Sequence, residues 1–177
     1  QAGQLREAEE LYRSILQADP RQLDCLYYLG MIALQEGRPK DAVDLISQSL
    51  AERPDDPNAL NHLGEAYRFL GFLDEAKTCF EKALALKEDF FQAYNNLGNV
   101  FDELGRVDDA VSSYRRALES ADDAEIRINF ARSAQHLDTS HADTGLRALV
   151  ARAIEEAWTR PSDLASAAIK LVRGNAV

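Results

Sequence analysis

The chain has 177 residues, of which 46% are hydrophobic and 28% charged, and its formal net charge is −10. This composition excludes a collagen-like or disordered chain, and the acidic balance argues against a nucleic-acid partner, because phosphate binding needs a basic surface. No apolar run approaches the roughly 20 residues of a membrane span, and two cysteines cannot build a disulfide framework. We therefore expect a cytoplasmic protein without a membrane partner, in which Cys25 and Cys79 are buried thiols.

Residues of several kinds recur along the chain at a spacing of 34, which indicates a repeat protein. One glycine series is Gly3, Gly37, Gly71 and Gly105, and an alanine series is Ala8, Ala42, Ala76 and Ala110. A second glycine series is Gly30, Gly64 and Gly98, and a bulky series is Tyr12, Ile46, Phe80 and Tyr114. Because these series keep one register, each unit is expected to repeat the same local structure.

The first predicted element, in residues 1–22, is the second helix of a truncated repeat. Its apolar stripe consists of Leu5, Ala8, Leu11, Tyr12, Ile15 and Leu16. A terminal repeat normally presents a polar outer face, so this stripe needs a cover. We interpret the chain as a trimmed part of a longer protein; the alternatives are a self-sufficient end, or one covered by another copy of the chain.

Three full repeats follow, over residues 23–56, 57–90 and 91–124. Apolar residues at spacings of three and four predict two helices in each repeat. Gly71 is expected to end the first helix of the second repeat in a left-handed conformation. Gly64 and Ala76 are expected where the two helices approach closely, because a larger side chain there would overpack.

The last third keeps helical periodicity but loses the strict repeat. Residues 125–160 fit a degenerate fourth repeat if the register slips by one residue, which places Phe130 and Ala131 at packed positions. Its second helix is expected to run through Trp158, with the indole in the core. Residues 161–177 are expected to form a C-terminal capping helix.

The run from Ala93 to Asn99, with Ala110 and the run from Tyr114 to Leu118, resembles the consensus of the tetratricopeptide repeat (TPR) family. The resemblance covers residues 1 to about 124 and, in decayed form, the rest. It implies an all-α fold: a right-handed superhelical α-solenoid of antiparallel helix pairs, with about ten helices. It also implies that the first helices line a concave groove for a protein or peptide partner.

The resemblance places the groove residues at Tyr27, Tyr28, Asn58, Asn61, His62, Arg68, Gln92, Asn95, Asn96, Asn99 and Asn129. Amides recur among them, and an amide can both donate to and accept from a peptide backbone. This pattern is similar to the asparagine ladder in the TPR arms of O-linked N-acetylglucosamine transferases, although Tyr28 and His62 replace asparagine at two positions. The alternative is that asparagine is only a tolerated polar residue on an exposed face. Chaperone-binding TPR domains clamp acidic tails with basic residues that are missing here, so we reject that partner.

No motif points to catalysis, a metal or a cofactor. The three histidines are scattered, no phosphate-binding or nucleophile motif occurs, and carboxylate pairs such as Asp55 and Asp56 fall at helix starts, where they cap. We therefore predict a non-catalytic scaffold, an interaction module that binds an extended peptide or a partner helix in its groove. The alternatives are the substrate-recognition arm of a larger enzyme, such as a glycosyltransferase or methyltransferase, and a homo-oligomer formed through the N-terminal helix.

Overall fold

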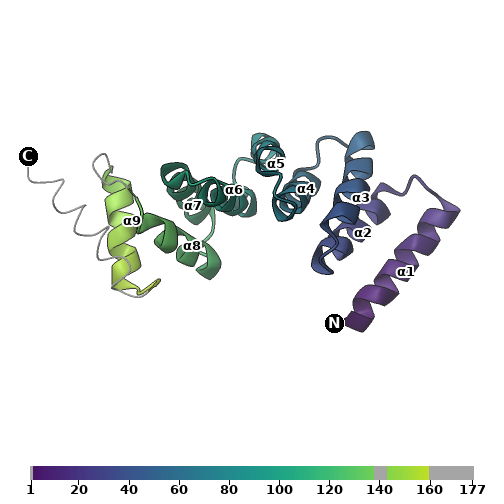
Figure 1. Cartoon of the computed structure of the whole chain (residues 1–177), viewed down its shortest axis with the longest axis horizontal. Coiled ribbons are helices and arrows are strands. Elements are labelled where there is room, and N and C mark those ends of the chain that lie inside the picture. The colour runs from purple at the N-terminus through teal and green to yellow at the C-terminus, as the bar shows by residue number, and fades with distance from the viewer. Residues whose placement is uncertain (1, 138–142, 160–177) are drawn as a thin grey trace, which may run out of the picture. The chain divides into compact units, whose positions relative to one another are not determined.

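The computed structural model describes residues 2–137 and 143–159, which form nine α-helices and no strand. The helices are α1 (Ala2–Ala18), α2 (Leu23–Gln35), α3 (Pro39–Glu52), α4 (Pro57–Phe69), α5 (Leu73–Leu86), α6 (Phe91–Glu103), α7 (Val107–Ser120), α8 (Ala124–Ala134) and α9 (Thr144–Glu155). They belong to two compact units, residues 1–88 with α1 to α5 (unit 1) and residues 89–177 with α6 to α9 (unit 2) (Figure 1). The all-α class is confirmed, the repeat boundaries stay predictions, and the expected helix at 161–177 lies outside the described residues.

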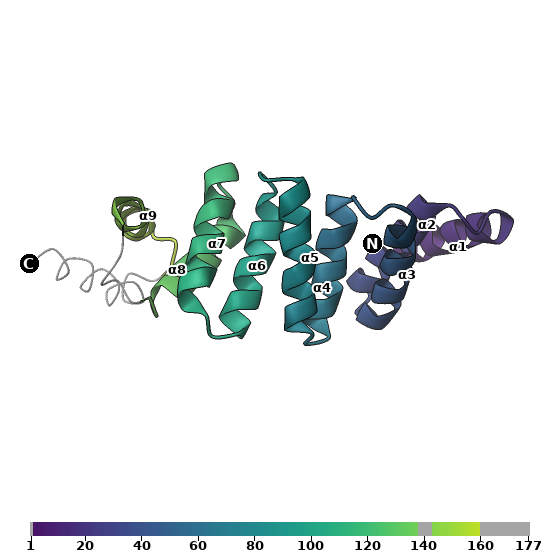
Figure 2. The same ribbon diagram turned by 90° about the horizontal axis from the view of Figure 1, so that it is seen from above.

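The turn between the two helices of each full repeat depends on glycine. Gly37, Gly71 and Gly105 have φ angles of 71°, 80° and 71°, the left-handed conformation that was expected. After Gly71, the amide of Phe72 donates to the carbonyl of Tyr67 over 2.9 Å, which closes a Schellman-type end. The second helix can therefore fold back beside the first, as α6 and α7 do in Figure 2.

The second glycine series marks the closest approach of the paired helices. A Cβ atom added to Gly64 would lie 2.7 Å from the Phe80 ring, and one added to Gly98 would lie 2.5 Å from the Tyr114 ring. Both rings are fully buried. The side chain nearest to Gly64 is thus Phe80 rather than Ala76, so each repeat packs a bulky residue against bare backbone.

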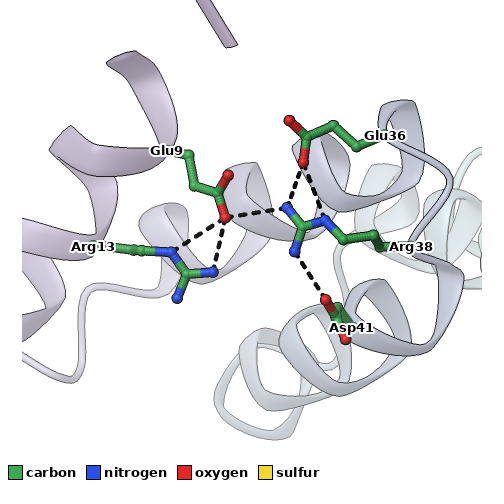
Figure 3. A network of polar contacts seen from close by, with 5 residues as sticks. All are labelled: Glu9, Arg13, Glu36, Arg38 and Asp41. Carbon is green, nitrogen blue, oxygen red and sulfur yellow. Dashed lines mark hydrogen bonds and ion pairs between the residues drawn. The ribbon is translucent and has the colours of Figure 1, made fainter. Parts of the chain in front are cut away.

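Helix α1 is held to the first full repeat by a network of charged groups (Figure 3). Glu9 accepts hydrogen bonds from Arg13 over 2.8 Å and from Arg38 over 3.1 Å, and Arg38 also donates to Glu36 and Asp41. Hydrogen bonding by Arg13, the largest cause, and the charge of Arg38 lower the pKa of Glu9. The network therefore links α1 to the turn before α3.

The start and the surface of α1 differ from those of the other second helices. The helix includes Gly3, whereas the register predicts a turn there. The left-handed glycines are held by carbonyls of a preceding helix, as in the bond from Gly37 to Leu34, and Gly3 has no such helix within the described residues. Leu11 is 59% exposed, and self-association through α1 stays a prediction.

Replacing Arg38 by alanine is expected to loosen α1 selectively, because this arginine joins Glu9 to the α2–α3 turn. Amide hydrogen exchange of residues 5–16 should become about two- to fivefold faster, the range of a partly exposed ion pair. Arg106→Ala is the matched control, since Arg106 occupies the same repeat position and pairs with Asp109 in its own helix. Equal exchange in both variants would contradict this role for Arg38.

Burial in α8 follows the one-residue slip, whereas α9 ends earlier than expected. Phe130 and Ala131 are fully buried, as predicted. The expectation that this helix reaches Trp158 is wrong: α9 ends at Glu155, and the amide of Trp158 donates to the carbonyl of Ala153 over 3.0 Å. Ala157 there takes a φ of 52°, the left-handed conformation that the glycines adopt after the first helices of the full repeats.

Trp158 lies in the core, as the sequence indicates. The residue is 6% exposed, and its ring meets the edge of Phe130 with the two centroids 6.0 Å apart. The guanidinium groups of Arg127 and Arg152 lie 5.7 Å and 5.3 Å from the ring centroid. Because the indole contacts one aromatic ring and two guanidinium groups, its role is in packing.

Candidate functional site

A small cavity opens between the first helices of unit 1. It has a volume of about 280 Å³ and is lined by Met31, Leu34 and Gln35 of α2 and by His62, Glu65 and Phe69 of α4. Ligand pockets are usually about 300–1,000 Å³ in volume, so this α2–α4 cavity suits one bulky side chain better than a whole cofactor. Phe69 at its edge is 63% exposed, and the Arg68 guanidinium lies 5.1 Å from that ring.

An aromatic cluster adjoins the cavity. The Tyr27 hydroxyl lies 3.0 Å from Nδ1 of His62, and His62 itself lines the cavity. Tyr28 is 45% exposed and stacks on Tyr12 with the ring centroids 5.5 Å apart. Burial raises the pKa of Tyr27 to about 12, so its hydroxyl stays protonated and available for hydrogen bonding at neutral pH. The first-helix face of unit 1 thus combines apolar, aromatic and polar contacts.

The predicted groove residues differ sharply in their accessibility. Those that are exposed are Tyr28, Asn58 and Gln92, and those that are half-buried are Tyr27, His62, Arg68 and Asn99. The buried ones are Asn61, Asn95, Asn96 and Asn129. The amides that motivated the ladder hypothesis are therefore mostly turned into packed surroundings.

Two of these amides hydrogen-bond to each other across neighbouring repeats of unit 2. Nδ2 of Asn129 donates to Oδ1 of Asn95 over 3.1 Å, and Arg132 donates to Oδ1 of Asn129 over 3.1 Å. The bond between Tyr27 and His62 joins the equivalent positions of two repeats in unit 1. In both units, these positions form a contact between repeats.

A second polar network lies on the same face of unit 2. The Tyr114 hydroxyl lies 2.8 Å from Oδ1 of Asn99 and 2.9 Å from Oδ2 of Asp102, and the Ser133 hydroxyl also donates to Asp102. Burial, and next the Asp102 carboxylate, strongly raise the pKa of Tyr114. Helices α6, α7 and α8 are therefore tied together at Asp102.

Sequence reasoning did not select Leu34, Gln35 and Phe69, which also line the cavity. The groove positions were chosen by repeat spacing, and these residues lie closer to the turn. One signal was available for Phe69, because the equivalent residue of the third repeat is the charged Glu103. An aromatic residue at an exposed helix end is a candidate contact for a partner.

Carboxylates that could have indicated catalysis act as helix caps. Asp56 accepts from the amides of Asn58 and Ala59, and Asp123 caps α8 in the same way. Within residues 2–137 and 143–159, no cluster of three or more histidine, cysteine, aspartate or glutamate side chains could hold a metal ion.

The two thiols and the helix lengths bear on the remaining sequence predictions. Cys25 and Cys79 are free and buried, as expected, and burial raises the pKa of both thiols, that of Cys79 to about 11. None of the described helices has the length and apolar character needed to cross a membrane.

Comparison with known proteins places these features in a family. Two tetratricopeptide repeat models match residues 1–65 and 55–123. No curated protein sequence matches the chain at a significant level.

Solved structures of similar fold are also TPR proteins. MamA is 20% identical, with a TM-score of 0.67 over 99% of this chain and 91% of its own. A thermophilic TPR protein of Thermus thermophilus is 24% identical, with a TM-score of 0.66 over 97% and 92%. The first TPR of Spaghetti (RPAP3), bound to the HSP90 peptide SRMEEVD, is 22% identical, with a TM-score of 0.63 over 67% and 94%. The fold and the two matches agree, and the chain belongs to the tetratricopeptide repeat family.

Proposed function

We propose that this chain is a non-catalytic interaction module that binds a peptide segment of a partner protein on the first-helix face of unit 1. The observation that carries the proposal is the α2–α4 cavity, which offers Met31, Leu34 and Phe69 to one apolar side chain of the partner. Buried apolar anchors contribute most of the energy of such interfaces. The peptide complex of the RPAP3 domain supports a peptide as the class of partner.

Polar groups around the cavity would hold the backbone of the bound segment. Tyr28 is exposed, and Tyr27, His62 and Arg68 are half-buried. The proposal includes a second set of peptide-binding residues, the amides Asn61, Asn95, Asn96 and Asn129. Because they are buried, their contribution requires a partner that reaches the few atoms left accessible.

Phe69→Glu is expected to weaken peptide binding by about tenfold or more, since it removes an apolar wall of the cavity. Peptides selected from a displayed library on the wild-type chain provide the probes, and their affinities for wild type and variant are measured by titration calorimetry. Phe72→Arg is the matched control, because Phe72 is also exposed but does not line the cavity. Both substitutions copy a residue of the third repeat, Glu103 and Arg106, so each is compatible with the fold.

Equal loss in the two variants, or no loss in either, would contradict the cavity as the anchor site. A triple variant that replaces Asn61, Asn95 and Asn96 by alanine tests the ladder separately. Its unfolding midpoint must be measured alongside, because buried amides also affect stability. Unchanged affinity in a folded triple variant would remove the ladder from the proposal.

A further inference from the structure

The opposite side of unit 1 carries a larger groove, between the second helices α3 and α5. Its volume is about 650 Å³, within the range of about 300–1,000 Å³ that is usual for ligand sites. Leu60 and Leu63 of α4 form its floor and are 7% and 8% exposed, so apolar atoms line the bottom. In Figure 1, α3 and α5 lie on one side of α2 and α4, so this α3–α5 groove is separate from the α2–α4 cavity.

Short side chains on α3 keep the groove open. Ser47 and Ala51 line it from α3, and Glu75 lines it from α5. Two repeats later, the residue equivalent to Ser47 is Arg115, and Asp143 precedes the next second helix, α9. In unit 2, these two residues form an ion pair of 2.7 Å between α7 and the start of α9.

The groove therefore lacks an ion pair of the kind that joins α7 to the start of α9 in unit 2. Serine at position 47 is too short to span to Glu75, and within the described residues neither Asp74 nor Glu75 is in an ion pair. Both carboxylates lie in the first turn of α5 and line the groove. One end of the groove is consequently acidic above an apolar floor.

The other end has the opposite charge. Lys82 lines the groove about two turns further along α5, where Pro54 follows the end of α3. A bound segment would thus meet carboxylates at one end, an ammonium group at the other, and leucine side chains between them. Charge complementarity of this kind fixes the orientation of a partner segment.

We propose that the α3–α5 groove is a second docking site, which binds an amphipathic helix of a partner protein with lysine or arginine at the end facing Asp74 and Glu75. The occupant is a helix because two parallel second helices form an apolar trough, into which a third helix packs by its apolar side chains. The site works independently of the α2–α4 cavity, so one partner can occupy each side of unit 1.

Ser47→Arg tests the site by copying the residue that spans the gap in unit 2. The arginine is expected to pair with Glu75 and to fill the groove while the helices stay in place. Displayed random peptides of roughly 12 residues are selected on the wild-type chain and counter-selected on this variant. The enriched sequences should carry apolar residues at spacings of three and four and a basic residue at one end, and they should bind the variant about tenfold less tightly or worse.

Two matched variants make the result specific. Ser47→Ala removes the hydroxyl but leaves the groove open, so affinity should be unchanged. Phe69→Glu, which disrupts the α2–α4 cavity, should also leave these peptides bound, and this separates the present proposal from the proposed function. The proposal is overturned if no peptide distinguishes wild type from Ser47→Arg, if the enriched peptides are acidic at both ends, or if Phe69→Glu abolishes their binding.

Discussion

Replacing Gly64 by leucine is expected to lower the free energy of unfolding by about 3 kcal/mol, the upper end of the usual cost of overpacking. A Cβ atom alone would lie 2.7 Å and 2.8 Å from two carbons of the Phe80 ring. That ring is fully buried, so it has no solvent-facing space into which it could move. The added side chain must therefore push α4 and α5 apart. Urea denaturation followed by helical circular dichroism measures the loss.

A rescue experiment identifies the cause of this loss. Gly64→Ala combined with Phe80→Leu should recover part of the stability that Gly64→Ala loses alone, because the smaller partner leaves room for the new methyl group. Gly71→Ala provides the contrast: a Cβ there meets nothing within 4 Å, and the cost of about 1 kcal/mol comes only from the positive φ. A change within about 0.5 kcal/mol for Gly64→Leu, the range of ordinary surface sites, would show that the helix pairing is wrong.

Tyr114→Phe is expected to cost about 1–3 kcal/mol at neutral pH, because it leaves polar groups of a packed network without their donor. The hydroxyl lies within hydrogen-bonding distance of Asn99 and Asp102, and the ring that carries it is fully buried. The equivalent residues of the first two repeats are Ile46 and Phe80, so the apolar packing tolerates the loss of the oxygen. The measurable cost is therefore that of the hydrogen bonds.

The same substitution should change the response to alkaline pH. The folded chain holds the pKa of Tyr114 well above its ordinary value of 10.0, because burial and the Asp102 carboxylate disfavour the phenolate. Stability from this group is complete below the unfolded value and is lost as the pH rises above it, since only the unfolded chain then releases the proton. Unfolding free energies at pH 8 and pH 11 should fall less in Tyr114→Phe than in wild type. Equal falls would show that Tyr114 does not drive the alkaline loss.

Much of the fold could be predicted because its signals are local. Gly71 ends a helix through its own backbone freedom, and Asp56 caps α4 through amides two and three residues away. The end of α9 could not be predicted in this way, because no glycine marks it. There Ala157 adopts a conformation that a pattern assigns to glycine, and the hydrogen bond of Trp158 to Ala153 secures it.

The candidate site was less predictable because it depends on contacts between repeats. Repeat spacing placed His62 on the first-helix face, where it lines the α2–α4 cavity, and it also placed Asn95 and Asn129 there as accessible amides. Their side chains instead bond to each other. The distance between them along the chain is a whole repeat, so no local pattern shows that each amide has the other as its partner.

The sequence by itself determined the repeat, the paired helices and the glycine turns, since each follows from residues within one repeat. Only the tertiary structure decided which polar side chains are accessible and where the surface is hollow. Those properties depend on the size of side chains that face one another from different helices, such as Ser47 opposite Glu75 in unit 1 and Arg115 opposite Asp143 in unit 2. A short residue leaves a groove and a long one closes it, and that outcome exists only once the helices are packed.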